Sequence, residues 1–149
     1  NKIRLKNVTF YIFDPFNSKG YSKINSLKNI RAYVVNDLSF VKKITFNLIH
    51  FGSCIQYLKD YRKPIKNINF SKDSKILITA TPLTLNKEYL CKQSNQINLF
   101  QIIHNFKKLE SYFKKLSFYL IFKSSFNIKL ASIKNIKKKT FILNLLFKK

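Results

Sequence analysis

The chain has 149 residues, of which 29 are Lys or Arg and 6 are Asp or Glu, giving a formal net charge of +23 at pH 7. Like charge at this density opposes a compact state, so the composition implies a bound polyanion, either nucleic acid or an anionic membrane surface. Hydrophobic residues make up 46% of the chain, with 15 Phe and 8 Tyr, which excludes wholesale disorder and predicts a domain with a core.

The choice of residues also indicates where the gene resides. Nearly all of the positive charge comes from Lys, and Arg occurs only at Arg4, Arg31 and Arg62. Arg binds phosphate bidentately, so selection for binding alone would not have removed it. Lys, Asn, Ile, Phe and Tyr have AT-rich codons and are abundant, whereas the chain holds only 2 Gly and 3 Pro. We therefore expect an AT-rich organellar gene and a protein of the mitochondrial matrix.

The first elements in chain order are short. Residues 7–13 (NVTFYIF) are rich in β-branched and aromatic side chains and precede Asp14-Pro15, which predicts a strand followed by a turn. Residues 14–23 hold Pro, Gly and Ser and predict a loop. Residues 30–35 are ambiguous between strand and helix.

A helix followed by three short strands is predicted for residues 37–80. Asp37 is a candidate N-cap, apolar residues follow at helical spacing, and Gly52 is a candidate C-terminal stop. The runs 54–58, 65–70 and 76–79 are apolar and are separated by polar segments typical of turns.

A long basic amphipathic helix is predicted for residues 97–122, where apolar residues recur every three or four positions and paired lysines lie off that stripe. The runs 127–131 and 141–147 predict strands around a basic cluster at 134–139. The expected fold class is α+β, with an N-terminal extension (1–36), the helix and three-strand module (37–80) and a basic helix with a C-terminal extension (81–149).

Catalysis and metal binding are not expected. The acidic residues are scattered, and neither His50 nor His104 has an obvious nucleophile nearby in sequence. Cys54 and Cys91 are too few and too far apart for a zinc ribbon or a redox pair. We expect no enzyme, no cofactor, no metal and no small-molecule substrate. The longest uncharged stretch, 44–58, is too short to cross a membrane, so no transmembrane insertion is expected.

Lysine clusters are the positive evidence for nucleic-acid binding, because almost no acids interrupt them. The predicted RNA-binding residues are Arg31, Lys42, Lys43, His50, Lys59, Arg62, Lys63, Lys66, Lys107, Lys108, Lys114, Lys115, Lys134, Lys137, Lys138 and Lys139. Aromatic residues beside lysines could stack on unpaired bases, although core packing also explains them. A basic amphipathic helix also fits a membrane-surface protein, and a nucleic-acid-binding protein outside the ribosome would share the charge.

A Lys-rich, acid-poor chain of this kind resembles a mitochondrial ribosomal protein, whose counter-charge is ribosomal RNA. The stretch LIHFGSCIQYLKDYRKPIKNINFSKDSKILI resembles the RNA-binding module of small-subunit ribosomal protein four. The residues at matching places are His50, Gly52, Pro64, Asp73 and Ile76. An alternative is small-subunit ribosomal protein eight. The protein-four resemblance implies that Lys42, Lys43, His50, Lys59, Arg62 and Lys63 face RNA, and that neighbouring ribosomal proteins are partners.

Overall fold

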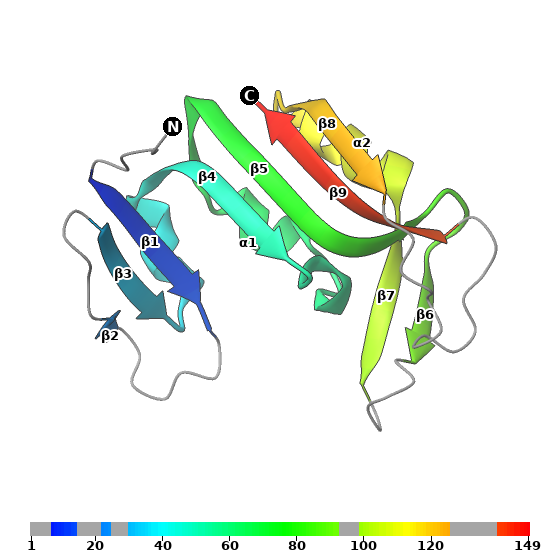
Figure 1. Ribbon diagram of the computed structural model, residues 1–149, viewed down its shortest axis with the longest axis horizontal. Coiled ribbons are helices and arrows are strands. Elements are labelled where there is room, and N and C mark those ends of the chain that lie inside the picture. Colours follow the sequence, from blue (N-terminus) through cyan, green and yellow to red (C-terminus); the bar gives the residue numbers. More distant parts are fainter. Residues whose placement is uncertain (1–6, 15–21, 25–29, 93–98, 126–139) are drawn as a thin grey trace, which may run out of the picture. The chain divides into compact units, whose positions relative to one another are not determined.

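The computed structural model describes residues 7–14, 22–24, 30–92, 99–125 and 140–149. The chain forms two compact units: unit 1 comprises Asn1–Thr45 and Lys66–Asn69, and unit 2 comprises Phe46–Ile65 and Phe70–Lys149. Strands account for 59% of the described residues. The predicted α+β class, with its leading helix and long basic helix, is therefore wrong, and the protein is mostly β (Figure 1).

Unit 1 contains a three-stranded sheet in the order β1-β3-β2. Its elements are β1 (Val8–Phe13), β2 (Ser22–Ile24), β3 (Ile30–Val35) and the 3-10 helix η1 (Leu38–Lys43). β1 runs parallel to β3, so that Tyr11 lies opposite Tyr33 and their rings stack with centroids 5.5 Å apart. The strand predicted at 7–13 is confirmed, and the ambiguous segment 30–35 is a strand because it pairs with β1 and holds the β-branched residues Ile30, Val34 and Val35.

Unit 2 is built around a six-stranded sheet with the order β6-β7-β5-β9-β8, in which β4 also pairs with β5. The strands are β4 (Thr45–Gly52), β5 (Asn69–Thr84), β6 (Tyr89–Lys92), β7 (Phe100–Asn105), β8 (Tyr119–Ser125) and β9 (Thr140–Lys148). Figure 1 shows β5 as a long, bent strand that runs beside both β4 and β9. β5 is antiparallel to β9 and parallel to β7, with Leu83 opposite His104.

The core of unit 2 lies between this sheet and three short helices: η2 (Ile55–Tyr57), α1 (Arg62–Lys66) and α2 (Phe106–Lys115). Leu109 and Phe113 on α2 have no exposed surface, and the Phe113 ring lies 4.7 Å from the ring of Phe147 on β9. The strand predicted at 141–147 is confirmed, since β9 buries Leu143, Leu145 and Phe147 on alternate positions. These contacts hold α2 on the sheet.

The long helix predicted at 97–122 is only ten residues long, because both ends carry strong stop signals. At the start, the Asn105 side chain accepts a hydrogen bond from the Lys108 amide at 2.9 Å. At the end, Ser117 adopts a left-handed φ of 64°, and the Phe118 amide donates to the Phe113 carbonyl at 2.9 Å, which closes a Schellman motif. The flanking residues form β7 and β8 instead.

The helix and three-strand module predicted at 37–80 is also wrong. Asp37 caps η1 as expected, accepting a hydrogen bond from the Ser39 amide at 2.8 Å, but β4 follows directly. β4 forms because exposed residues alternate with the inward-facing Ile49 and Phe51, a period of two rather than 3.6. The predicted strands at 54–58 and 65–70 are wrong, because η2 occupies the first segment and the end of α1 lies in the second. β5 begins only at Asn69 and continues through the polar run, since Ser74 lies buried and donates to the Phe46 carbonyl at 2.6 Å.

Two predicted segments, the strand at 127–131 and the basic cluster at 134–139, lie outside the described residues. Within the described part of the chain, none of the helices has the length and apolar character required to cross a bilayer.

Candidate nucleic-acid interface

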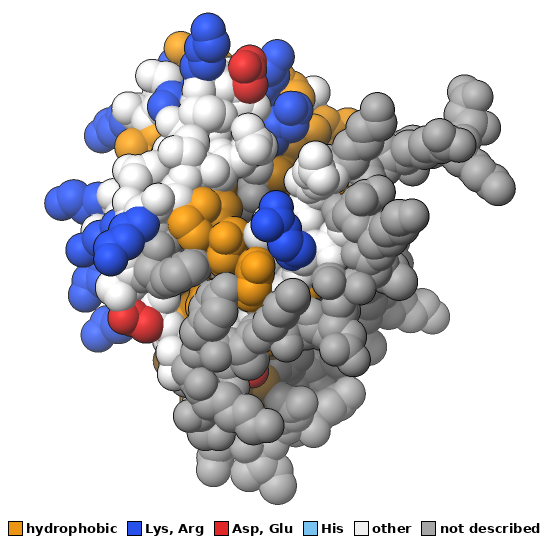
Figure 2. Space-filling model, turned by 90° about the vertical axis from the view of Figure 1, so that its left-hand side faces the viewer, with side chains coloured by type: hydrophobic (Ala, Val, Ile, Leu, Met, Phe, Trp, Pro, Cys, Tyr) orange, Lys and Arg blue, Asp and Glu red, His pale blue; other side chains and the backbone are white. Residues whose placement is uncertain are grey.

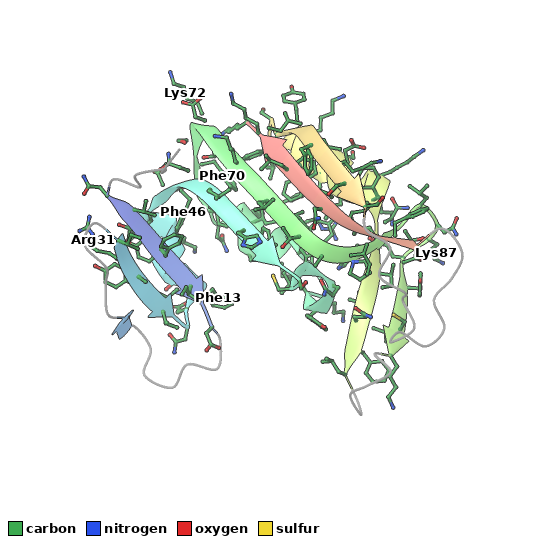
Figure 3. All side chains as sticks on the ribbon, in the orientation of Figure 1. Phe13, Arg31, Phe46, Phe70, Lys72 and Lys87 are labelled. Carbon is green, nitrogen blue, oxygen red and sulfur yellow. The ribbon has the colours of Figure 1, made fainter. Side chains whose placement is uncertain are left out.

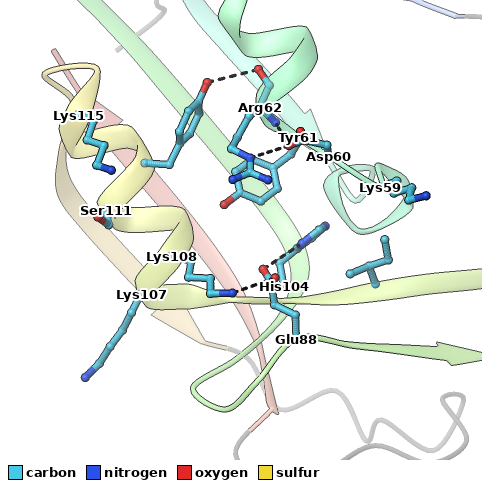
Figure 4. A pocket seen from close by; sticks show the side chains of 12 residues that line it. Lys59, Asp60, Tyr61, Arg62, Glu88, His104, Lys107, Lys108, Ser111 and Lys115 are labelled. Carbon is cyan, nitrogen blue, oxygen red and sulfur yellow. Dashed lines mark hydrogen bonds and ion pairs between the residues drawn. The ribbon is translucent and has the colours of Figure 1, made fainter.

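Unit 2 contains a concave pocket of about 500 Å³ that is lined mainly by charged and polar side chains (Figure 4). Its walls come from the segment joining η2 to α1, from Glu88 before β6, from the end of β7 and from one face of α2. The lining residues are Lys59, Asp60, Tyr61, Arg62, Glu88, Ile102, His104, Lys107, Lys108, Ser111, Tyr112 and Lys115.

The first wall is fixed by Asp60, which caps the start of α1. Its carboxylate accepts from the Arg62 amide at 3.1 Å and from Arg62 Nε at 2.7 Å. The hydrogen bond from the Arg62 side chain lowers the pKa of Asp60 and keeps it ionised. The Tyr112 hydroxyl on α2 donates to the Arg62 carbonyl at 3.3 Å, which ties the two walls of the pocket together.

The second wall is organised by Glu88. Its Oε1 accepts from the Asn105 amide at 3.2 Å and lies 3.5 Å from His104 Nδ1, while Oε2 lies 3.4 Å from Lys108 Nζ. Burial raises the pKa of Glu88, but the Asn105 hydrogen bond and the charges of Lys108 and His104 outweigh it, so the pKa lies below its ordinary value. The buried His104 ring also faces the Leu58 carbonyl, with Nε2 at 3.2 Å.

Positive charge dominates the pocket. Five cationic side chains line it against two acidic ones, a net charge of +3, and both acids are already paired with a cation of the pocket. Lys59, Lys107 and Lys115 form no ion pair with any residue that the structure describes. Lys107 and Lys108 also occupy the first turn of α2, where the helix dipole disfavours cations. An anion in the pocket would pair with Lys59, Lys107 and Lys115 and would offset the cations at the positive end of α2.

Tyr61 is buried in the wall of the pocket beside His104. Its side chain is 5% exposed, and its hydroxyl points into the pocket on the side of α2 (Figure 4). The ring is held edge-on by His104 at 5.0 Å and by Tyr112 at 5.8 Å. Burial, with the charge of Glu88, raises the pKa of Tyr61 to about 12, so the hydroxyl keeps its proton and remains a donor.

The structure brings together two clusters that the sequence treats separately. Lys59 and Arg62 from the first cluster line the same pocket as Lys107, Lys108 and Lys115 from the second. Other predicted residues are exposed but lie outside the pocket. These are Lys63 and Lys66 on α1, Lys114 on α2, His50 on β4, Arg31 on β3, and Lys42 and Lys43 on η1. His50 Nε2 lies 2.9 Å from the Thr79 hydroxyl, so a contact within the protein already engages it. Lys134, Lys137, Lys138 and Lys139 fall outside the described residues.

A second group of lysines, which sequence reasoning missed, lies where β5 begins and β9 ends. Lys75 is directly opposite Lys148 across these strands, and like charges in that position destabilise a sheet. Lys72 projects from the same end of β5, as Figure 3 shows, and Lys149 follows β9. We call these four lysines the basic strand end. On the face that Figure 2 presents, Lys and Arg side chains likewise stand among few acidic groups.

Sequence reasoning also missed the roles of Tyr61, Asp60, Glu88, Ser111 and Tyr112. The Asp60–Arg62 contact has a local signal, because an Asp two residues before a backbone amide often caps a turn. The approach of Glu88 to His104 has no such signal, since it depends on how β6 and β7 pair.

Searches against family models, curated proteins and solved structures found no match to this chain.

Proposed function

We propose that this chain is a structural protein of the mitochondrial ribosome, located in the matrix, that binds ribosomal RNA mainly through phosphate contacts. One observation carries the proposal: cationic side chains from two distant parts of the sequence converge on one concave site whose acids are already paired. Phosphodiesters would supply the anions that these lysines lack. The net charge of the whole chain, +23 over 149 residues, calls for a polyanion that can contact many lysines.

The basic strand end supports the same class of ligand. A Lys–Lys pair held across two strands is costly unless an external anion screens it, and successive RNA phosphates along a strand can screen several lysines at once. Binding of this kind reads shape and charge rather than base sequence, which suits a protein that fixes RNA helices and neighbouring ribosomal proteins. We favour the small subunit.

Crosslinking in intact mitochondria, followed by sequencing of the attached RNA, tests this proposal. Crosslinks concentrated in small-subunit ribosomal RNA, together with sedimentation of the protein with ribosomal subunits, are the expected result. Crosslinks in large-subunit RNA would keep the ribosomal role and change the subunit. Recovery of DNA or lipid with few RNA crosslinks would refute the proposal and favour a nucleic-acid-binding protein outside the ribosome or a membrane-surface protein.

A further inference from the structure

The Tyr61 hydroxyl is a donor that opens into the pocket from a largely buried side chain. The side chain is 95% buried, lines the pocket and makes no hydrogen bond to any residue that the structure describes. The hydroxyl itself opens into the pocket, so a ligand held there can accept a hydrogen bond from it, which a phenylalanine at this position could not offer.

The surroundings of this hydroxyl define the chemistry of that acceptor. Lys107, Lys108 and Lys115 reach the pocket from α2, and Ser111 offers a second hydroxyl from the same helix face. The positive end of α2 lies on this side as well. A pocket that offers a neutral hydroxyl donor and more cations than carboxylates fits a phosphate group, which has several acceptor oxygens and carries negative charge.

The opposite rim offers a place for the base of a nucleotide. The Arg62 side chain is 60% exposed, yet its guanidinium is held in place by Asp60 Oδ1 at 2.7 Å. A planar cation fixed in this way is a surface on which an unpaired base can stack. The pocket volume of about 500 Å³ falls in the range of sites that hold one small molecule, and is far too small for a duplex.

We propose that this pocket holds a single unpaired nucleotide of the bound RNA, with the Tyr61 hydroxyl donating to a phosphate oxygen and the base stacking on Arg62. The inference rests on the proposed RNA binding and adds to it a preference for unpaired over paired nucleotides. A paired A-form backbone keeps its phosphates on the outer surface of the helix, where they meet the rim lysines but not Tyr61. A bulged or single-stranded nucleotide can enter the pocket.

The test compares Tyr61→Phe with Tyr119→Phe, which removes the same atom from a tyrosine that is 58% exposed on β8 and outside the pocket. Fluorescence anisotropy measures binding of the full chain to an RNA hairpin with one bulged nucleotide and to the same hairpin fully paired. For Tyr61→Phe we expect about tenfold weaker binding to the bulged hairpin, the typical effect of one hydrogen bond to a charged group, and no change for the paired one. Tyr119→Phe should bind both as the wild type does.

Several results would overturn the inference. One such result is that Tyr61→Phe binds the bulged hairpin as tightly as the wild type does. Another is that Tyr61→Phe binds both hairpins more weakly by the same factor. Binding of adenosine monophosphate that requires Tyr61, with RNA binding unchanged, would assign the pocket to free nucleotides instead. Failure of the wild-type protein to bind either hairpin would refute the proposed function itself. Thermal unfolding without RNA separates misfolding from these outcomes, because losing an unpartnered hydroxyl should not lower the melting temperature.

Discussion

The salt dependence of RNA binding offers the most direct test of the pocket. Lys59, Lys107 and Lys115 line it and have no ion pair among the described residues. Replacing all three with Gln removes the charges and keeps most of each side-chain stem. Each cation that neutralises a phosphate of a single strand contributes about 0.7 to the slope of log K against log salt, so the triple variant should lose about 2 from this slope.

That change is large enough to measure. Between 50 and 200 mM salt, a slope difference of about 2 means that wild-type affinity falls about 20-fold further than that of the variant. Fluorescence anisotropy with a short single-stranded RNA, repeated at several KCl concentrations, gives both slopes. Folding should be little affected, because the three lysines are exposed and Lys107 opposes the dipole of α2.

A matched variant separates a site from diffuse charge. Lys63→Gln, Lys87→Gln and Lys114→Gln remove the same charge from exposed lysines outside the pocket, each of which is a sequence neighbour of a pocket residue. We expect a markedly smaller change in slope for this variant. Equal changes in the two triple variants would refute the reasoning, because RNA would then bind to the overall charge of the chain and not to the pocket.

Three further predictions concern stability. Phe113→Ala should lower the free energy of unfolding by about 3–5 kcal/mol in urea titrations, because the ring is fully buried, and a loss below about 1 kcal/mol would contradict the described core. Ser117→Gly should raise the melting temperature, since Gly removes a strain of about 1 kcal/mol at φ 64°; a lower melting temperature would argue against the Schellman motif. The pKa of Glu88 is lowered in the folded state, so its contribution is complete above the ordinary value of 4.5 and is lost as the pH falls toward the folded pKa. Urea unfolding between pH 3 and 7 should therefore show that the free energy of unfolding of the wild type, relative to that of Glu88→Gln, falls as the pH is lowered. A difference that stays constant with pH would show that ionised Glu88 does not stabilise the fold.

Local sequence signals predicted the elements that depend on local chemistry. The strands at the two ends of the described chain, β1 and β9, were predicted from short runs rich in β-branched, aromatic and other apolar residues. Asp37 was identified as a cap because the Asp side chain bonds to the amide two residues on, whatever surrounds it. In the same way, α2 buries Phe106, Leu109 and Phe113, and this spacing of three and four residues lies on one face of a helix but on both faces of a strand.

Segments whose periodicity was ambiguous were decided by their partners. β4 contains apolar residues that fit a helix nearly as well as a strand, and pairing with β5 favours the strand. The polar residues around Ser74 resemble a turn in sequence. They lie inside β5 because the serine finds a hydrogen-bond partner at Phe46, and a sequence-based prediction cannot supply a partner 28 residues away.

The sequence by itself determined the charge of this protein, and with it the class of ligand that we propose, because net charge does not depend on the fold. Only the tertiary structure decided where that charge acts. Lys59 and Lys115 are 56 positions apart in the chain, and they share a pocket because α2 packs beside the segment that leads into α1. The unpartnered hydroxyl of Tyr61 emerges in the same way, since a missing hydrogen bond can be recognised only after every neighbouring group has been placed.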